Sequence, residues 1–181
     1  MNIFVLSTGR AGSYTFYKAC QYIDNYSAGH ETRVKFLGSE RLKYPDNHIE
    51  IDNRLTWLLG RLDQQYGNNA IYIHLTRDKE ATAKSFSKRF HNRKSIIKAY
   101  KDAILMSPYS NANYKRIDYS RDYIATVNSN ITFFLKDKKF QMNFHVENAK
   151  QDFRRFWSLI QAEGDLSAAE GIWHKKYNRS G

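Results

Sequence analysis

The chain has 181 residues, and its 41% hydrophobic, 26% charged and 15% aromatic content excludes a disordered protein and suffices for a buried core. A formal net charge of +11 indicates a surface that attracts anions, without deciding between nucleic acid, membrane lipid and a phosphorylated small molecule. The single cysteine, Cys20, excludes an intramolecular disulfide, and the first apolar run is too short for a signal peptide or a membrane span. We therefore expect one domain over residues 1–181, cytoplasmic and in a reducing compartment.

The predicted elements of the first half follow from hydrophobic periodicity. Residues 2–7 form a short apolar run that predicts a buried strand, and residues 13–23 carry apolar side chains at helical spacing. Residues 48–52 alternate polar and apolar, which predicts a short strand or an extended loop, and a helix is expected over about 54–66.

The second half repeats this alternation of strand and helix. Residues 70–75 predict another buried strand, and a basic helical stretch follows over 78–106, with a break expected near His91 and an end before Pro108. A helix over 119–135, a strand over 140–146 and an amphipathic helix over 149–160 complete the pattern. The alternation predicts an α/β fold with three layers, in which helices flank a central, mostly parallel sheet. Ligands of such folds bind at the carboxyl ends of the strands.

The first strand ends in "STGRAGS", residues 7–13, which suits an anion site. Gly9 and Gly12 allow backbone amides to approach an anion, and the helix that follows adds partial positive charge at its N-terminus. Arg10 adds a full charge, and Ser13 and Thr15 can donate hydroxyl hydrogen bonds. An ATP-binding loop would be longer and would carry a lysine, so that class of site is disfavoured. The simpler alternative is a strand-to-helix turn that binds nothing.

The predicted strand over 70–75 has a similar end at Arg77 and Asp78, and Ser85 follows eight residues after Arg77. An arginine in this place can form paired hydrogen bonds with a phosphate. Ser85 lies about two helical turns further on and reaches the same group if the helix passes over it. The alternatives are a local salt bridge between Arg77 and Asp78, and a serine in contact with water.

Taken together, "STGRAGS" and "LTRDKEATAKSF" resemble the sulfotransferases that use 3′-phosphoadenosine 5′-phosphosulfate (PAPS). The Arg-x-Gly-Ser form is closest to the carbohydrate-sulfotransferase-like branch, and the strand over 140–146, Glu147 and "DFRRFW" extend the resemblance to about residue 162. It implies a P-loop-like fold and a sulfotransferase with PAPS as cofactor and 3′,5′-adenosine bisphosphate (PAP) as product. The chain shows no clear counterpart of the family's C-terminal Arg-Lys-Gly loop, so the sequence does not identify the residues that form the third side of the 3′-phosphate site.

The resemblance also implies the two halves of the cofactor site. Arg77 and Ser85 would bind the 3′-phosphate. The 5′-phosphosulfate would be bound by the first loop, comprising Gly9, Arg10, Ala11, Gly12, Ser13, Tyr14 and Thr15. Tyr14 stands where the family often has a small hydroxyl residue.

Sulfuryl transfer needs a positive charge beside the departing 5′-phosphate and a base for the acceptor's proton. Arg10 suits the first task. For the base, the resemblance favours Glu31, which lies 21 residues beyond Arg10 in "SAGHET". His48 is the second candidate and His30 the third, and each is alternatively an ordinary structural polar residue.

Residues 91–123 are expected to line the site of a small-molecule or glycan acceptor, whose identity the sequence does not give; nor does it give the oligomeric state. The basic side chains of the predicted helix are either a solvated surface or a wall that attracts an anionic cofactor; they are Lys84, Lys88, Arg89, Arg93, Lys94, Lys98 and Lys101. The tyrosines that follow would stack on a sugar or cap the core; they are Tyr109, Tyr114, Tyr119 and Tyr123.

Other classes of function are disfavoured by what these motifs leave unexplained. The histidines are dispersed, so no metal site is expected. A nucleic-acid-binding protein would explain the charge and the tyrosines but not the two strand-end motifs, and no nucleic-acid partner is expected. A P-loop kinase-like phosphotransferase shares the predicted architecture and is the main alternative.

Overall fold

A computed structural model of the protein describes residues 1–92, 95–107 and 113–174. Its five strands form one sheet in the order β2-β3-β1-β4-β5, and every neighbouring pair is parallel. The strands are β1 (Asn2–Leu6), β2 (Ser27–His30), β3 (His48–Ile51), β4 (Ala70–Thr76) and β5 (Gln141–His145). The predicted α/β class with a parallel central sheet is confirmed.

The helices of the described residues connect these strands. The α-helices are α1 (Ser13–Cys20), α2 (Leu59–Tyr66), α3 (Lys79–Lys88), α4 (Ile96–Ala99), α5 (Arg116–Leu135), α6 (Ala149–Leu159) and α7 (Leu166–Gly171). The short helices are η1 (Gly38–Leu42), η2 (Asn53–Trp57), η3 (Tyr100–Ile104), η5 (Val146–Asn148) and η6 (Ile172–His174). None of the helices in the three described ranges is long and apolar enough to cross a membrane.

Two expected helices differ from the structure. The helix expected over 54–66 is divided into the 3₁₀ helix η2 and the α-helix α2. The basic stretch expected over 78–106 is divided into α3, α4 and the π-helix η3. The break near His91 is confirmed, because α3 ends at Lys88 and residues 89–91 form a turn, after which the Asn92 amide donates to the Arg89 carbonyl at 3.1 Å.

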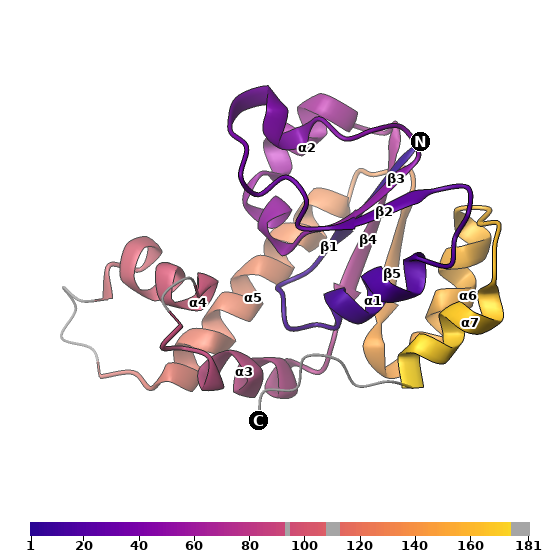
Figure 1. Cartoon of the computed structure of the whole chain (residues 1–181). Coiled ribbons are helices and arrows are strands. Elements are labelled where there is room, and N and C mark those ends of the chain that lie inside the picture. The colour runs from indigo at the N-terminus through magenta and orange to yellow at the C-terminus, as the bar shows by residue number, and fades with distance from the viewer. Residues whose placement is uncertain (93–94, 108–112, 175–181) are drawn as a thin grey trace.

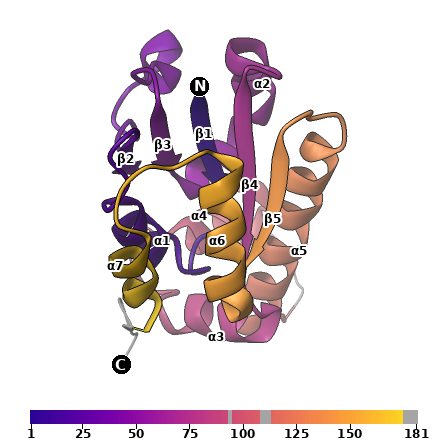
Figure 2. The same cartoon turned by 90° about the vertical axis from the view of Figure 1, so that its right-hand side faces the viewer.

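Both faces of the sheet are covered, as the alternation along β1 requires. Ile3 and Val5 face a core shared with α1, α6 and α7, whereas Phe4 and Leu6 face a second core shared with α2, α3 and α5. Figures 1 and 2 show the sheet between these two helical layers. The three-layer prediction is therefore confirmed.

The two strand ends singled out by the sequence lie side by side. β1 and β4 pair in parallel with Leu6 level with His74, so the segments that leave them emerge at the same edge of the sheet. In Figure 1, β4 runs down toward α3. The neighbouring strand β1 ends beside β4 before the chain turns into α1. This edge is the place where a ligand of a parallel sheet is expected.

Candidate functional site

The loop between β1 and α1 depends on backbone conformations that favour glycine. Gly9, Arg10 and Gly12 have φ angles of 80°, 58° and 83°. Gly12 is the N-cap of α1, and its carbonyl accepts from the Phe16 amide at 2.9 Å. A Cβ at Gly12 would lie 3.0 Å from Cγ2 of Val146, so the loop also packs closely against the end of β5.

Buried hydrogen bonds fix the start of this loop, directly after β1. The Tyr123 side chain is fully buried, and its hydroxyl donates to the Thr8 carbonyl at 3.0 Å. Burial raises the pKa of Tyr123, so the phenol keeps the proton that it donates. The Thr8 hydroxyl donates to the Gly9 carbonyl at 2.9 Å, and the Gly9 amide donates to the Ser7 hydroxyl at 3.2 Å.

The structure brings the two predicted halves of the site together. Arg10 Nε donates to Ser85 Oγ at 3.0 Å, and Arg77 Nη1 donates to the Arg10 carbonyl at 3.5 Å. These contacts join residues 75 and 67 positions apart in the chain. Asp78 serves as the N-cap of α3, since its Oδ1 accepts from the Ala81 amide at 2.7 Å.

The charge at this edge is strongly positive. Burial, followed by repulsion from the Arg89 and Arg77 guanidinium groups, lowers the pKa of Arg10. Arg89 caps the C-terminus of α3 and follows Ser85 by four residues, which places both on one face of that helix. The sequence pattern grouped Arg89 with the other basic side chains of residues 78–106 and did not assign it to the site. The four-residue spacing from Ser85 was the signal that could have singled it out.

The remaining loop residues lie just before α1 or in its first turn. Ala11 is buried, and Ser13, Tyr14 and Thr15 are partly buried. His30 borders this turn: its Nε2 lies 3.3 Å from Ser13 Oγ, and its ring meets the Tyr14 ring edge-on with centroids 5.7 Å apart.

Glu31 lies at the same edge of the sheet, directly after β2. Its Oε2 is 2.7 Å from Nη1 of Arg54, and its side chain is 31% exposed. Its amide donates to the Ile51 carbonyl at 3.1 Å, which holds the residue at the end of the neighbouring strand. β2 is two strands from β1, a lateral separation of about 10 Å.

His48 is not brought to the site. Its amide donates to Asn2 Oδ1 at 3.2 Å, so it lies at the amino end of the sheet, four residues of β1 or about 13 Å from the loop. The ring is buried between Ser27 Oγ at 2.8 Å and Glu50 Oε2 at 3.0 Å. The structure therefore places His48, the first residue of a parallel strand, at the edge of the sheet opposite the loop and away from Arg10, Arg77 and Ser85.

The short helix η2 connects the loop, Glu31 and a cavity. It starts after Asp52, a buried carboxylate that is paired with Arg41 and accepts from the Arg54 amide at 2.8 Å. Asn53 lies against the loop, since a Cβ on Gly9 would be 2.9 Å from its Nδ2. Arg54 pairs with Glu31, and Trp57, the last residue of η2, lines the cavity.

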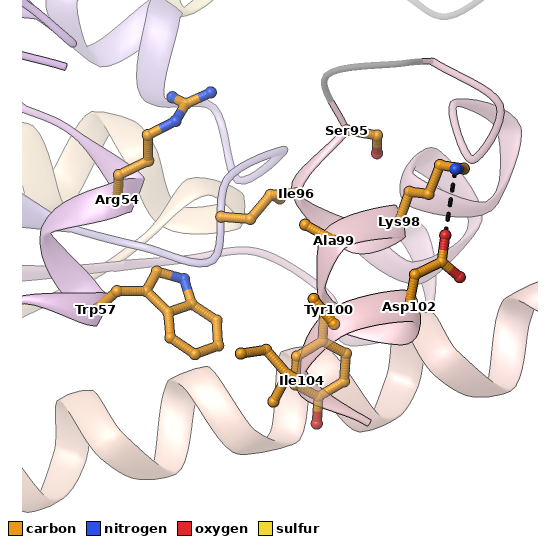
Figure 3. Close-up of a pocket in the computed structure, with 10 residues that line it drawn as sticks. Arg54, Trp57, Ser95, Ile96, Lys98, Ala99, Tyr100, Asp102 and Ile104 are labelled. Carbon is orange, nitrogen blue, oxygen red and sulfur yellow. Dashed lines mark ion pairs between the residues drawn. The ribbon is translucent and has the colours of Figure 1, made fainter. Parts of the chain in front are cut away.

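This cavity, of about 510 Å³, lies between η2 and the segment of α4 and η3 (Figure 3). Its lining includes Ser95, Ile96, Tyr100 and Ile104, all within the range expected to form the acceptor site. A second cavity, of about 460 Å³, is lined in part by Tyr114 and Tyr119. Three other residues of the sequence interpretation, Arg93, Lys94 and Tyr109, lie outside the described residues.

Comparisons with known proteins bear on the fold. No protein-family model matches the chain, and no curated protein sequence matches it either. Among solved structures, the chain is similar to mouse sulfotransferase SULT7A1 complexed with PAP, with a TM-score of 0.56 and 14% sequence identity. The chain has the sulfotransferase fold.

That likeness covers 96% of this chain and 63% of the mouse protein, so the chain spans less than two thirds of its structural neighbour. At this identity the likeness concerns the fold alone, and it does not support the closer resemblance to the carbohydrate branch. Within the described part of the chain, no group of three or more His, Cys, Asp or Glu side chains is placed to hold a metal ion.

Proposed function

We propose that the protein is a PAPS-dependent sulfotransferase that acts on a hydroxyl or an amine of a small acceptor. The observation that carries the proposal is the contact of Arg10 with Ser85, because it joins the two strand-end motifs into one basic site. The fold likeness to a sulfotransferase complexed with PAP is independent support.

The side chains at this edge fit a ligand with two anionic groups. The loop from Gly9 to Thr15 and the N-terminus of α1 would bind the 5′-phosphosulfate. Arg77 and Ser85 would bind the 3′-phosphate. Ser85 suits that role because its oxygen accepts from Arg10 and its hydroxyl still has a proton to donate.

Arg89 would supply the third side of the 3′-phosphate site. The C-terminal Arg-Lys-Gly loop of the family has no clear counterpart in this sequence, whereas Arg89 lies one helical turn beyond Ser85 on the same face of α3. The Arg89 guanidinium group lies near enough to Arg10 to lower the pKa of that residue, and guanidinium groups can bind phosphate in a bidentate way. We therefore assign the 3′-phosphate to Arg77, Ser85 and Arg89.

When bound, PAPS supplies the sulfuryl group that is transferred. Arg10 and the loop amides would offset the negative charge that builds on the departing 5′-phosphate. The Glu31 carboxylate would accept the proton of the acceptor's hydroxyl or amine, and the ion pair with Arg54 would hold that carboxylate in place. His30, which contacts Ser13 in the first turn of α1, is the alternative base.

Calorimetry with PAP and with AMP, which lacks the 3′-phosphate, tests the cofactor site. Arg77→Ala and Arg89→Ala should each weaken PAP binding by about 10- to 150-fold, equivalent to about 1.5 to 3 kcal/mol, and leave AMP binding nearly unchanged. Arg61→Ala, which removes the same charge from α2, is the matched control and should change neither affinity.

Three results would contradict these assignments. Absence of PAP binding by the wild-type protein would overturn the function itself. Equal losses for PAP and AMP in the arginine variants would overturn the 3′-phosphate assignment. Thermal stabilisation by ATP and Mg²⁺, with none by PAP, would favour a kinase-like phosphotransferase instead.

A further inference from the structure

We propose that the cavity between η2 and α4–η3 binds the acceptor and selects an alcohol with a flat, apolar body, such as an aromatic alcohol, over a glycan. The proposal rests on the sulfotransferase function proposed above. The sequence left the acceptor open between a small molecule and a glycan, and the cavity favours the small molecule.

The position of the cavity next to the transfer site is the first step. The Trp57 ring stacks on Tyr123, with centroids 6.5 Å apart, and the Tyr123 hydroxyl holds the Thr8 carbonyl at the start of the loop. On the same short helix, Arg54 lines the cavity and pairs with Glu31. An acceptor in the cavity therefore lies next to both the loop and the candidate base.

The composition of the walls is the second step. Apolar surface dominates the lining, with Trp57 on one side and Ile96, Tyr100 and Ile104 on the other. Figure 3 shows the Trp57 indole directed toward Tyr100 and Ile104. Trp57 is 40% exposed and Ile104 58% exposed, so both present apolar surface that a ligand would cover. The volume of about 510 Å³ suits a ligand of a few fused or linked rings.

The charged groups of the lining are the third step, because Arg54, Lys98 and Asp102 are each engaged in an ion pair. Arg54 pairs with Glu31 at 2.7 Å, and Lys98 pairs with Asp102 at 3.2 Å. The Tyr100 hydroxyl donates to Asp122 at 2.5 Å, so this residue offers the cavity mainly its ring.

A sugar needs a partner for each hydroxyl that it buries, and each one left unpaired costs about 1 to 3 kcal/mol. A single hydroxyl on an apolar ring carries no such penalty. It needs only the base and the sulfuryl donor, so the walls favour the aromatic alcohol.

The test compares 2-naphthol with N,N′-diacetylchitobiose as acceptors for the full chain supplied with PAPS. We expect sulfation of 2-naphthol with the higher kcat/KM. Trp57→Ala should raise the KM for 2-naphthol by at least about tenfold, and Ile104→Ser should leave the PAP affinity within about twofold of wild type. Ile104→Ser, at a more exposed position, should act in the same direction without disturbing the Tyr123 stack. Phe133→Ala, which removes an exposed aromatic ring from α5 away from the cavity, is the matched control.

The outcomes separate this inference from the function on which it rests. Absence of PAP binding would defeat both. With PAP binding intact, a higher kcat/KM for chitobiose would overturn the chemical class. Sulfation of 2-naphthol with an unchanged KM in Trp57→Ala and Ile104→Ser would overturn the location. If neither acceptor is sulfated, calorimetric titration of 2-naphthol into the PAP complex tests the cavity directly. Absence of 2-naphthol binding would refute the proposal, and so would equal affinities of the wild type and both variants.

Discussion

Replacing Gly12 by alanine should destabilise the protein at the centre of the candidate site. The φ angle of 83° costs a residue with a Cβ about 1 to 2 kcal/mol, and the new methyl group would meet Val146 Cγ2 at 3.0 Å. For a domain of this size, that cost corresponds to a fall in Tm of roughly 2 to 8 °C. The added methyl group also shifts the loop amides, so PAP affinity should fall together with stability.

Gly60→Ala is the control for this substitution. Gly60 lies in α2, where an added Cβ meets no atom within 4 Å among the described residues, so alanine should stabilise the helix by up to about 1 kcal/mol. Thermal unfolding with and without PAP compares the two variants. If Gly12→Ala unfolds at or above the wild-type temperature and binds PAP equally well, the conformation assigned to this loop is wrong.

Three further predictions concern two buried groups and the candidate base. Asp52→Asn leaves Arg41 as a buried charge without its counterion, so denaturant titration should show a loss of about 3 to 5 kcal/mol; a loss below 1 kcal/mol would show that the pair is not buried in solution. Glu31→Gln should keep PAP affinity and lose turnover with any acceptor that the wild type sulfates, and full activity would transfer the role of base to His30. Burial lowers the pKa of His74, which contacts Asn128 at 3.1 Å. The unfolding free energy should therefore be constant above about pH 6.5 and fall at lower pH by up to about 1.4 kcal/mol per unit, less steeply in His74→Gln. Identical slopes would refute this assignment.

The sheet was largely predictable because its central strands are continuous apolar runs. β1 and β4 are buried on both faces, which is the pattern of a parallel sheet between helices. β2 gave no such pattern: in Ser27–His30 only Ala28 is clearly apolar, and the segment is a strand because it pairs with β3 at the edge. Tertiary pairing, which periodicity does not report, decided this element.

The candidate site was predictable in part, for a similar reason. Strand ends identified Arg10, Arg77 and Ser85, because parallel strands place their carboxyl ends together. Alternation placed His48 and Glu50 on one face, which the structure confirms at 3.0 Å, but alternation does not say which end of the sheet a residue occupies. The position of His48 as the first residue of its strand already pointed to the amino edge.

The role of η2 was not visible in the sequence, because it depends on contacts between distant segments. Residues 54–66 carry a helical pattern, and nothing in that pattern separates Asn53–Trp57 from the helix after it. The division follows from Asp52, whose buried carboxylate accepts from the Arg54 amide and fixes the first turn. Hydrophobic periodicity does not report such a local polar contact.

The shortness of η2 has a consequence for how the two ligands would influence each other. Five residues contact the loop through Asn53, the candidate base through Arg54 and the acceptor cavity through Trp57. A segment this short has little freedom to adjust one contact independently of the others. Occupancy of either site should therefore change the affinity of the other, and thermodynamic linkage requires both changes to be the same factor. Cooperative binding would thus be a property of one turn of helix rather than of a domain movement.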